Sequence, residues 1–238
     1  MAYDQTSSKS RAALSGLAFL CIAGLLGGTR AAQAHPHIFI NAGQELIFDD
    51  QGRLSAVRAR WAYDEMFTLL MVEDGGFDTN GNGAIDAAEL PQFRLWDADW
   101  PDDFAGDMVV EIGGTAVSLE RPTDWEAAWE DGRAISMHTR VLSKPQPVTG
   151  EVIIRAFDPD YYTAYTITEA PKFTGRDDCS GQIFGPDIEA IPSELRDAIA
   201  ELSADVLISE SGIADSLGNG LPAVGEMYAE EVRATCGP

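Results

Sequence analysis

Short segments of alternating apolar and polar residues, separated by turn signals, constrain this chain more than any other feature of its sequence. The turn signals are DDQG at residues 49–52, GG at residues 113–114 and EDGR at residues 130–133. Alternation with a period of two places one face of a strand on a core, and a two-residue Gly-Gly turn suits a hairpin. The pattern predicts a mainly β (α+β) domain with a β-sandwich-like architecture. The candidate strands are residues 37–48, 54–63, 109–112, 116–119, 124–129, 134–142, 152–157 and 162–167.

Helical spacing interrupts the strand pattern between the second and third candidate strands. Residues 64–72 and 87–96 both show it, the second in spite of Pro91. With the loop that joins them, these stretches predict a helical insertion over residues 64–106. We therefore expect one β-rich domain, residues 35–238, with this insertion inside it.

The first 34 residues have the pattern of a secretory signal peptide. Lys9 and Arg11 precede a mostly apolar, uncharged run over residues 12–28, and Ala-Gln-Ala at the end of the segment suits a signal peptidase. An uncleaved membrane anchor is the alternative, but the run is short for a membrane span. We expect export to the periplasm with cleavage after Ala34.

Removal of this segment leaves a strongly acidic protein. Its 13 basic and 38 acidic residues give a net charge of −25. Such a charge disfavours binding to nucleic acid and to anionic membranes, and it attracts cations. A role in solubility alone is the simpler alternative.

The C-terminal part of the chain is expected to be helical and tied by a disulfide. Residues 193–203 and 224–235 show helical patterns. Two cysteines remain after cleavage, Cys179 and Cys236, and an even count in an exported protein predicts that they pair.

The most explicit motif is DTNGNGAIDAAE, residues 78–89, which has the spacing of an EF-hand calcium loop. Calcium takes six to eight oxygen ligands, and such a loop offers them at fixed positions. Gly83 permits the sharp turn, and Ile85 can pack inward. Because only one loop is present, we expect a structural Ca²⁺ site; a polar surface turn is the alternative. The expected ligands are Asp78, Asn80, Asn82, the Ala84 carbonyl, Asp86 and Glu89.

The three histidines predict a second, nitrogen-based metal site. After cleavage, His35 carries a free α-amine beside its imidazole, and His37 lies on the same face if the segment is extended. His138 falls in a candidate strand and could join them. Such donors suit Zn²⁺, Ni²⁺ or Cu²⁺ rather than calcium. Pro36 has no N–H to lose, which excludes square-planar binding through backbone amides. The alternative is that these are ordinary structural histidines.

Several segments together resemble an uncharacterised bacterial periplasmic family. They are HPHIFI, RWAYDEMFT, DTNGNGAID, PTDWEAAWEDGR and FDPDYYTAY, followed by a cysteine near the C-terminus. The family is a domain of unknown function, described as a periplasmic component of an ABC-type transport system and associated with nickel/cobalt-type permeases. The resemblance implies a role in handling transition metals, His35 and His37 as ligands, and a permease as partner; it implies no reaction.

We therefore expect an exported metal-binding accessory protein with a calcium-braced insertion. Two other functions stay open: a copper-dependent oxidative enzyme with an N-terminal histidine brace, and a calcium-stabilised interaction module. The sequence contains no phosphate loop, nucleophile elbow or redox cysteine pair, so an enzymatic function is not the main expectation.

Overall fold

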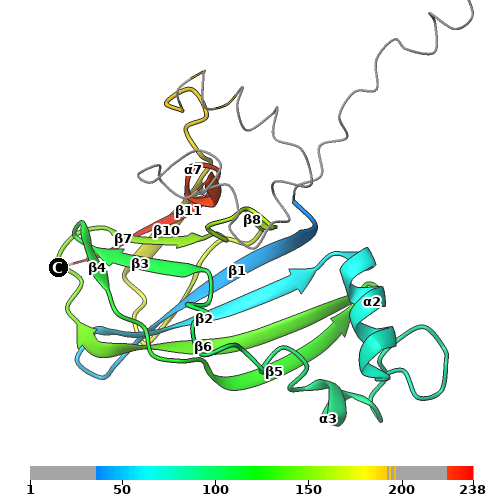
Figure 1. Cartoon of the computed structure of the whole chain (residues 1–238). Coiled ribbons are helices and arrows are strands. Elements are labelled where there is room, and N and C mark those ends of the chain that lie inside the picture. The colour runs from blue at the N-terminus through cyan, green and yellow to red at the C-terminus, as the bar shows by residue number, and fades with distance from the viewer. Residues whose placement is uncertain (1–35, 192, 194–195, 197–223, 238) are drawn as a thin grey trace, which may run out of the picture. The chain divides into compact units, whose positions relative to one another are not determined.

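Two β-sheets carry the described part of the chain (Figure 1). The computed structural model describes residues 36–191, 193, 196 and 224–237. These residues belong to a unit that runs from Ala34 to Pro238. The expected signal peptide, residues 1–34, and His35 lie outside the described residues.

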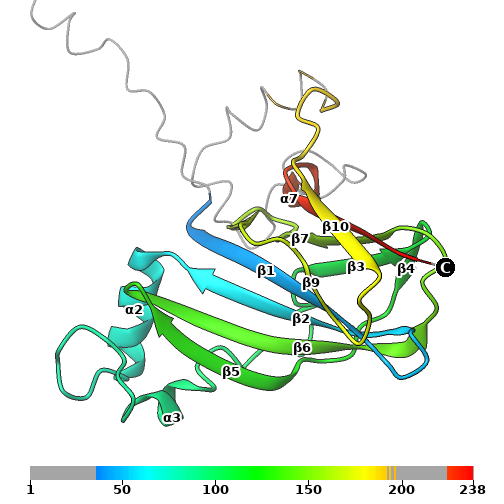
Figure 2. The ribbon, with the colours of Figure 1, turned by 180° about the vertical axis from the view of Figure 1, so that it is seen from behind.

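The strands confirm the expectation of a mainly β fold. The first sheet has the order β5-β6-β2-β1-β8, with β9 beside β1, and the second has the order β10-β11-β7-β3-β4 (Figures 1 and 2). The strands are β1 (Ile38–Phe48), β2 (Leu54–Tyr63), β3 (Met108–Ile112), β4 (Thr115–Val117), β5 (Thr123–Glu130), β6 (Arg133–Gln146), β7 (Val152–Ala156), β8 (Thr163–Ile167), β9 (Lys172–Thr174), β10 (Cys179–Phe184) and β11 (Glu231–Cys236). The helices with described bounds are α2 (Glu65–Gly75), α3 (Leu90–Phe93) and α7 (Val224–Met227).

Local turn chemistry fixes the first hairpin. Asp49 accepts backbone hydrogen bonds from Gln51 and Arg53 through Oδ1, at 2.9 and 3.0 Å, and Gly52 takes a φ of 69°. A short acidic side chain that bonds to the backbone two residues on favours this turn. The hairpin sets the β1–β2 register, in which Ala42 lies opposite Trp61.

Apolar side chains of both sheets form one main core, because each strand turns its alternate residues inward. Side chains that the two sheets contribute to this core are almost fully buried. Its members include Ile40, Leu46, Val57, Trp61 and Leu142 from the first sheet and Val110, Ile154 and Val232 from the second.

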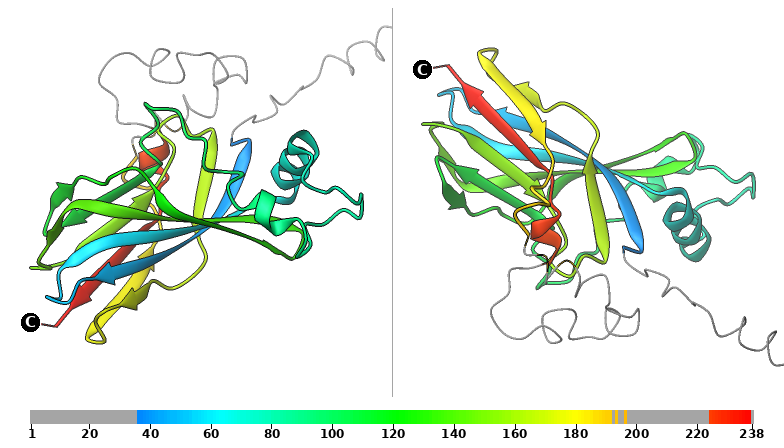
Figure 3. Two further views of the ribbon diagram at one scale, coloured as in Figure 1. Left: turned by 90° about the horizontal axis from the view of Figure 1, so that it is seen from below. Right: turned by 90° about the horizontal axis from the view of Figure 1, so that it is seen from above.

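The insertion between β2 and β3 lies at one end of the first sheet (Figure 3). It builds a second, smaller core there. Val72, Ile85 and Phe93 pack there against Ala134 of β6. The first helix begins at Asp64, whose side chain caps it by accepting the N–H of Phe67 at 2.9 Å. It ends where Gly76 takes the left-handed conformation, with a φ of 60°.

Pro91 does not disrupt α3, because it lies in the first turn of that helix, where its missing N–H needs no partner. The helix is nevertheless shorter than the predicted residues 87–96, since it spans four residues. Among the described residues, no helix has the length and apolarity to cross a membrane.

The predicted helix over residues 224–235 is wrong for most of its length. Only Val224–Met227 is helical, and Glu231–Cys236 forms a strand between β7 and β10. Val232 and Ala234 alternate into the main core, so tertiary pairing overrides the helical spacing. The other predicted C-terminal helix, residues 193–203, lies largely outside the described residues.

Candidate functional site

Asp78 organises the loop of residues 78–89 through backbone hydrogen bonds. Its Oδ1 accepts the N–H groups of Gly81 and Asn82, at 2.8 and 3.1 Å, and its Oδ2 accepts that of Gly83 at 2.7 Å. Gly81 and Gly83 have φ values of 70° and 81°, which favour glycine. The first residue of the motif therefore turns the chain around its own carboxylate.

Glu89 closes the loop from the other end. Its Oε1 accepts the Oγ1 hydroxyl and the N–H of Thr79, each at 2.7 Å, and its Oε2 accepts the N–H of Asp86 at 3.2 Å. The hydroxyl of Thr79, with the backbone N–H groups, holds the pKa of Glu89 below its ordinary value. Glu89 is 5% exposed, so a buried carboxylate faces back into the loop.

The remaining side chains of the motif converge on Asp86. Asn80 and Asn82 donate their amide N–H groups to its Oδ2, at 3.0 and 3.5 Å. If the side-chain amide of either asparagine is turned by about 180° about its last torsion, its oxygen takes the position that its nitrogen now occupies. With the Ala84 carbonyl, the loop offers carboxylate, amide and backbone oxygens, and this all-oxygen set fits Ca²⁺.

Ile85 connects this loop to the body of the protein. It is 4% exposed and packs in the second core with Val72 and Phe93. The expectation that this residue points inward is therefore confirmed, and any stiffening of the loop acts on that core.

The structure describes one of the two N-terminal histidines. His37 is exposed and directly precedes β1. Its N–H donates to the carbonyl of Tyr162 at 2.8 Å, and the two rings are 4.8 Å apart. The backbone of His37 is thus tied to the start of the parallel β1–β8 pair. His35, the other expected ligand, lies outside the described residues.

His138 is not brought to His37. In the first sheet His138 lies opposite Ala59, which lies opposite Gln44. His138 therefore lies two strand spacings from β1 and about seven residues along the strand direction from His37. With ordinary strand spacings, this puts the two histidines roughly 25 Å apart. Within the described ranges, no three His, Cys, Asp or Glu side chains gather in a metal-binding arrangement, and this applies to Asp78, Asp86 and Glu89 of the loop as well as to the histidines.

His138 instead belongs to a buried aromatic cluster. Its ring centre lies 4.6, 5.0 and 4.8 Å from those of Trp61, Trp100 and Trp125. Burial, followed by the charges of neighbouring arginines, lowers its pKa to about 3, so the imidazole is neutral. Neither ring nitrogen has a hydrogen-bond partner among the described residues.

A cavity of about 540 Å³ adjoins this cluster, and the sequence gives no sign of it. Its lining includes Ile38 and Thr163, the neighbours of His37 and Tyr162 in the chain. Residues 97–107, the loop that leads into β3, supply one side. The cavity is lined by Ile38, Ile40, Trp61, Tyr63, Phe67, Asp97, Trp100, Pro101, Asp103, Phe104, Asp107, Asp158, Thr163 and Tyr165.

An aspartate at each end of this loop accepts a tyrosine hydroxyl from the first sheet. Tyr63 donates to Asp97 at 3.0 Å, and Tyr165 donates to Asp107 at 2.8 Å. Burial raises the pKa of Asp97 to about 6 and that of Asp107 to about 7, against the opposing effect of these hydrogen bonds. Two carboxyl groups therefore titrate near neutral pH in one cavity.

Two arginines fasten the loop of residues 97–107 from outside the cavity lining. Arg121 donates to the carbonyls of Trp100 and Pro101, and Arg140 donates to that of Ala105 at 3.0 Å. The guanidinium of Arg140 also lies 5.7 Å from the centre of the Trp100 ring. The position of the loop is therefore set by several independent contacts.

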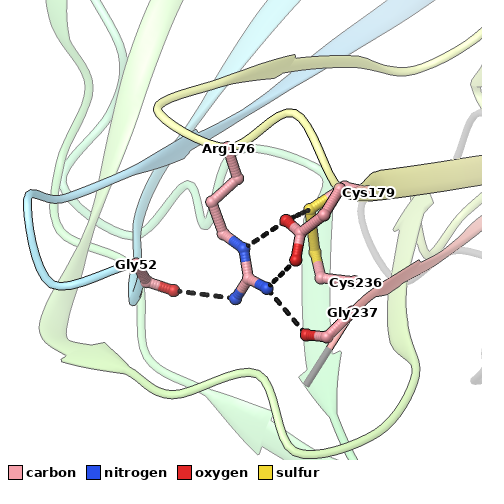
Figure 4. The surroundings of a disulfide bond; sticks show 6 residues. Gly52, Arg176, Cys179, Cys236 and Gly237 are labelled. Atoms are coloured by element: carbon pink, nitrogen blue, oxygen red, sulfur yellow. Dashed lines mark hydrogen bonds and ion pairs between the residues drawn. A yellow bond between two sulfur atoms is a disulfide. The ribbon is translucent and has the colours of Figure 1, made fainter.

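The predicted disulfide between Cys179 and Cys236 is confirmed and joins β10 to β11 (Figure 4). Arg176 lies beside it and binds both carboxylate oxygens of Asp178, at 2.6 and 2.8 Å. The same guanidinium donates to the carbonyls of Gly52 and Gly237. The end of β11 is thus tied covalently to β10 and, through Arg176, to the β1–β2 turn.

Comparison with known families gives a match over most of the chain. The model of a family described as "Protein of unknown function (DUF1007)" matches residues 20–236, which is most of the chain. No curated protein matches it.

Proposed function

The chain belongs to the DUF1007 family of proteins of unknown function, and from this premise we propose that it is an exported metal-binding accessory protein. It binds Zn²⁺, Ni²⁺ or Cu²⁺ at its mature N-terminus and passes the ion to or from a nickel/cobalt-type or ABC-type permease. Calcium in loop 78–89 braces the insertion. The proposal places the protein in the periplasm, with its signal peptide removed.

The observation that carries the proposal is the placement of His37. Its backbone is held by Tyr162 at the start of β1, while its side chain is exposed. His35 would add an imidazole and, after cleavage, an α-amine two residues away. Three nitrogen donors on one short segment suit a borderline transition metal, and the acidic protein raises the local concentration of cations.

Calorimetry on protein that begins at His35 tests the transition-metal site. We expect the variant His35→Ala/His37→Ala to lose most of its affinity for Zn²⁺, Ni²⁺ and Cu²⁺. A chain whose His35 α-amine is acetylated serves as a matched control, because it keeps both imidazoles and removes only the chelate with the α-amine. Equal affinity in wild type and the double alanine variant would refute the assignment.

Thermal and urea unfolding test the calcium site separately. With a dissociation constant of about 0.1–1 mM, as in extracellular calcium modules, about 10 mM calcium would stabilise the protein by about 1.4–2.7 kcal/mol. Glu89→Gln should abolish this gain because it removes the bidentate carboxylate. Glu73→Gln, which removes one exposed charge from α2, should retain it. A gain that survives in Glu89→Gln would exclude the site.

A second function, a calcium-stabilised interaction module, is favoured by the exposed apolar face of α2. Met66 and Leu69 are 72% and 63% exposed. Beside them, α2 and loop 78–89 line a groove of about 620 Å³, and its lining includes acidic residues such as Glu65 and Asp131. This combination suits a basic amphipathic segment. Binding of such a peptide should be lost in Leu69→Ser and unchanged in His35→Ala/His37→Ala.

A further inference from the structure

The cavity beside loop 97–107 combines aromatic side chains with carboxyl groups. Its lining contributes four aspartates from two parts of the chain: Asp97, Asp103 and Asp107 from the loop, and Asp158 from the segment before β8. Among the described residues that line it, none is basic. Its aromatic members are Trp61, Tyr63, Phe67, Trp100, Phe104 and Tyr165.

The aromatic rings hold one another in place. Trp61 and Trp100 stack with ring centres 5.7 Å apart and an interplanar angle of 16°. Phe104 meets Trp100 edge-on at 4.9 Å, and Tyr165 lies 5.5 Å from Trp61. Rings packed in this way form a preorganised wall, which a ligand can contact without ordering it first.

Hydrogen bonds fix the positions of two of the carboxyl groups. Tyr63 and Tyr165 orient Asp97 and Asp107 through their hydroxyl groups. A carboxylate accepts several hydrogen bonds, so each aspartate can accept a tyrosine hydroxyl and a ligand donor together. The nearby Arg121 and Arg140 donate to backbone carbonyls of the loop and do not line the cavity.

We propose that this cavity binds a small organic cation, an amine or a quaternary ammonium compound. Aromatic rings attract a positive charge through their quadrupoles, and the carboxylates complement it. The volume of about 540 Å³ lies in the range of small-molecule sites. A bare metal ion is a poorer fit, because a mostly aromatic wall cannot replace its shell of oxygen ligands.

The inference is independent of the proposed metal function, because His37, the one N-terminal histidine among the described residues, does not line the cavity. His138 lies directly behind the wall, in contact with Trp61 and Trp100, and its nitrogens have no partner among the described residues. A neutral imidazole there adds no positive charge that would oppose a cationic ligand.

Choline and its uncharged carbon isostere, 3,3-dimethyl-1-butanol, provide a direct test. Calorimetry and tryptophan fluorescence are measured at about pH 8, where Asp97 and Asp107 are ionised, with calcium present and transition metals removed. We expect choline to bind at least roughly tenfold more tightly than the isostere, because the two differ only in charge. Equal binding of the two compounds, or no binding of choline, would overturn the proposal.

Substitutions then locate the site. Asp103→Asn, on an exposed part of the loop, and Asp107→Asn should each weaken choline binding by roughly three- to tenfold. Asp50→Asn, in the exposed β1–β2 turn, removes the same charge elsewhere and should leave it unchanged. An equal loss in all three variants would mean general electrostatics and would overturn the site.

The two proposals fail separately in this design. Choline binding should persist in His35→Ala/His37→Ala, whatever that variant does to transition-metal affinity. If Zn²⁺ binding is the property that Asp103→Asn and Asp107→Asn reduce, while choline binds to none of the chains, the cavity is a metal site and the inference is wrong.

Discussion

Replacing Asp107 by Asn should remove a pH-dependent loss of stability that wild type suffers as pH rises from about 4 to about 8. Burial raises the pKa of Asp107 from 3.8 to about 7, and the negative charge of Asp158 adds to the effect of burial. The hydrogen bond from Tyr165 opposes both. An asparagine at this position can still accept that hydrogen bond, and it cannot ionise.

The direction of this pH dependence follows from the number of protons that the folded and unfolded states bind. Between the unfolded pKa of 3.8 and the folded pKa of about 7, the native state binds a proton that the unfolded state has released. The stability contributed by protonated Asp107 is therefore fully present below about pH 4 and is lost as pH rises through about 7. A shift of about three pKa units corresponds to about 4 kcal/mol, to order of magnitude.

Urea unfolding at a series of pH values and constant calcium measures this effect. The free energy of unfolding of Asp107→Asn minus that of wild type should rise by up to about 4 kcal/mol across the range, since other titrations cancel in the difference. Asp97→Asn should show a smaller rise at lower pH, because its pKa is raised only to about 6. The curve for Asp50→Asn should run parallel to wild type. A parallel curve for Asp107→Asn would refute the argument from burial.

Three further substitutions test how the fold is held together. Replacing Cys179 and Cys236 by Ser should cost about 4 kcal/mol in urea unfolding, because the bridge closes a loop with a sequence separation of 57; dithiothreitol should mimic the loss in wild type and have no effect on the variant. Ile85→Ala should cost about 3 kcal/mol through the cavity it leaves in the second core, measured by urea unfolding at fixed calcium. Asp64→Ala should cost about 1 kcal/mol and lower the thermal midpoint, because it removes the cap of α2 at Phe67.

The hairpins of the first sheet could be predicted from the sequence because their determinants are local. The predicted strand over residues 54–63 matches β2 at both ends, and Asp49 and Gly52 mark the turn before it. Alternation of apolar residues shows which face is buried before any partner strand is known. That local information was sufficient for these elements.

Strands made by distant pairing could not be found in the same way. Lys172–Thr174 pairs in parallel with β1, and Cys179–Phe184 pairs with a strand more than forty residues later in the chain. Glu231–Cys236 even carries helical spacing, and its strand structure depends on pairing with both β7 and β10. Such register is a tertiary property, which a short window of sequence does not contain.

The two sites differ for the same reason. Loop 78–89 can be recognised in the sequence because all of its candidate oxygen donors lie in one segment of twelve residues, where a rule on residue spacing applies. The cavity draws on β1, β2, α2, loop 97–107 and β8. Alternation along β2 indicates that Trp61 and Tyr63 point inward, but only the folded chain brings Asp97 and Asp107 to meet the aromatic rings.

The structure also identifies what calcium would brace. Loop 78–89 anchors Ile85 in the second core, where Phe93 stacks on Trp96 with ring centres 5.7 Å apart. Trp96 packs against both cores and meets Tyr63 edge-on at 4.9 Å, while Asp97, the next residue, accepts the hydroxyl of the same tyrosine. A continuous series of packed rings therefore leads from the loop to the wall of the cavity. If calcium binds as proposed, the order that it imposes on Ile85 is transmitted by close packing to the position of Asp97, so the loop stabilises the geometry of the cavity as well as its own turn.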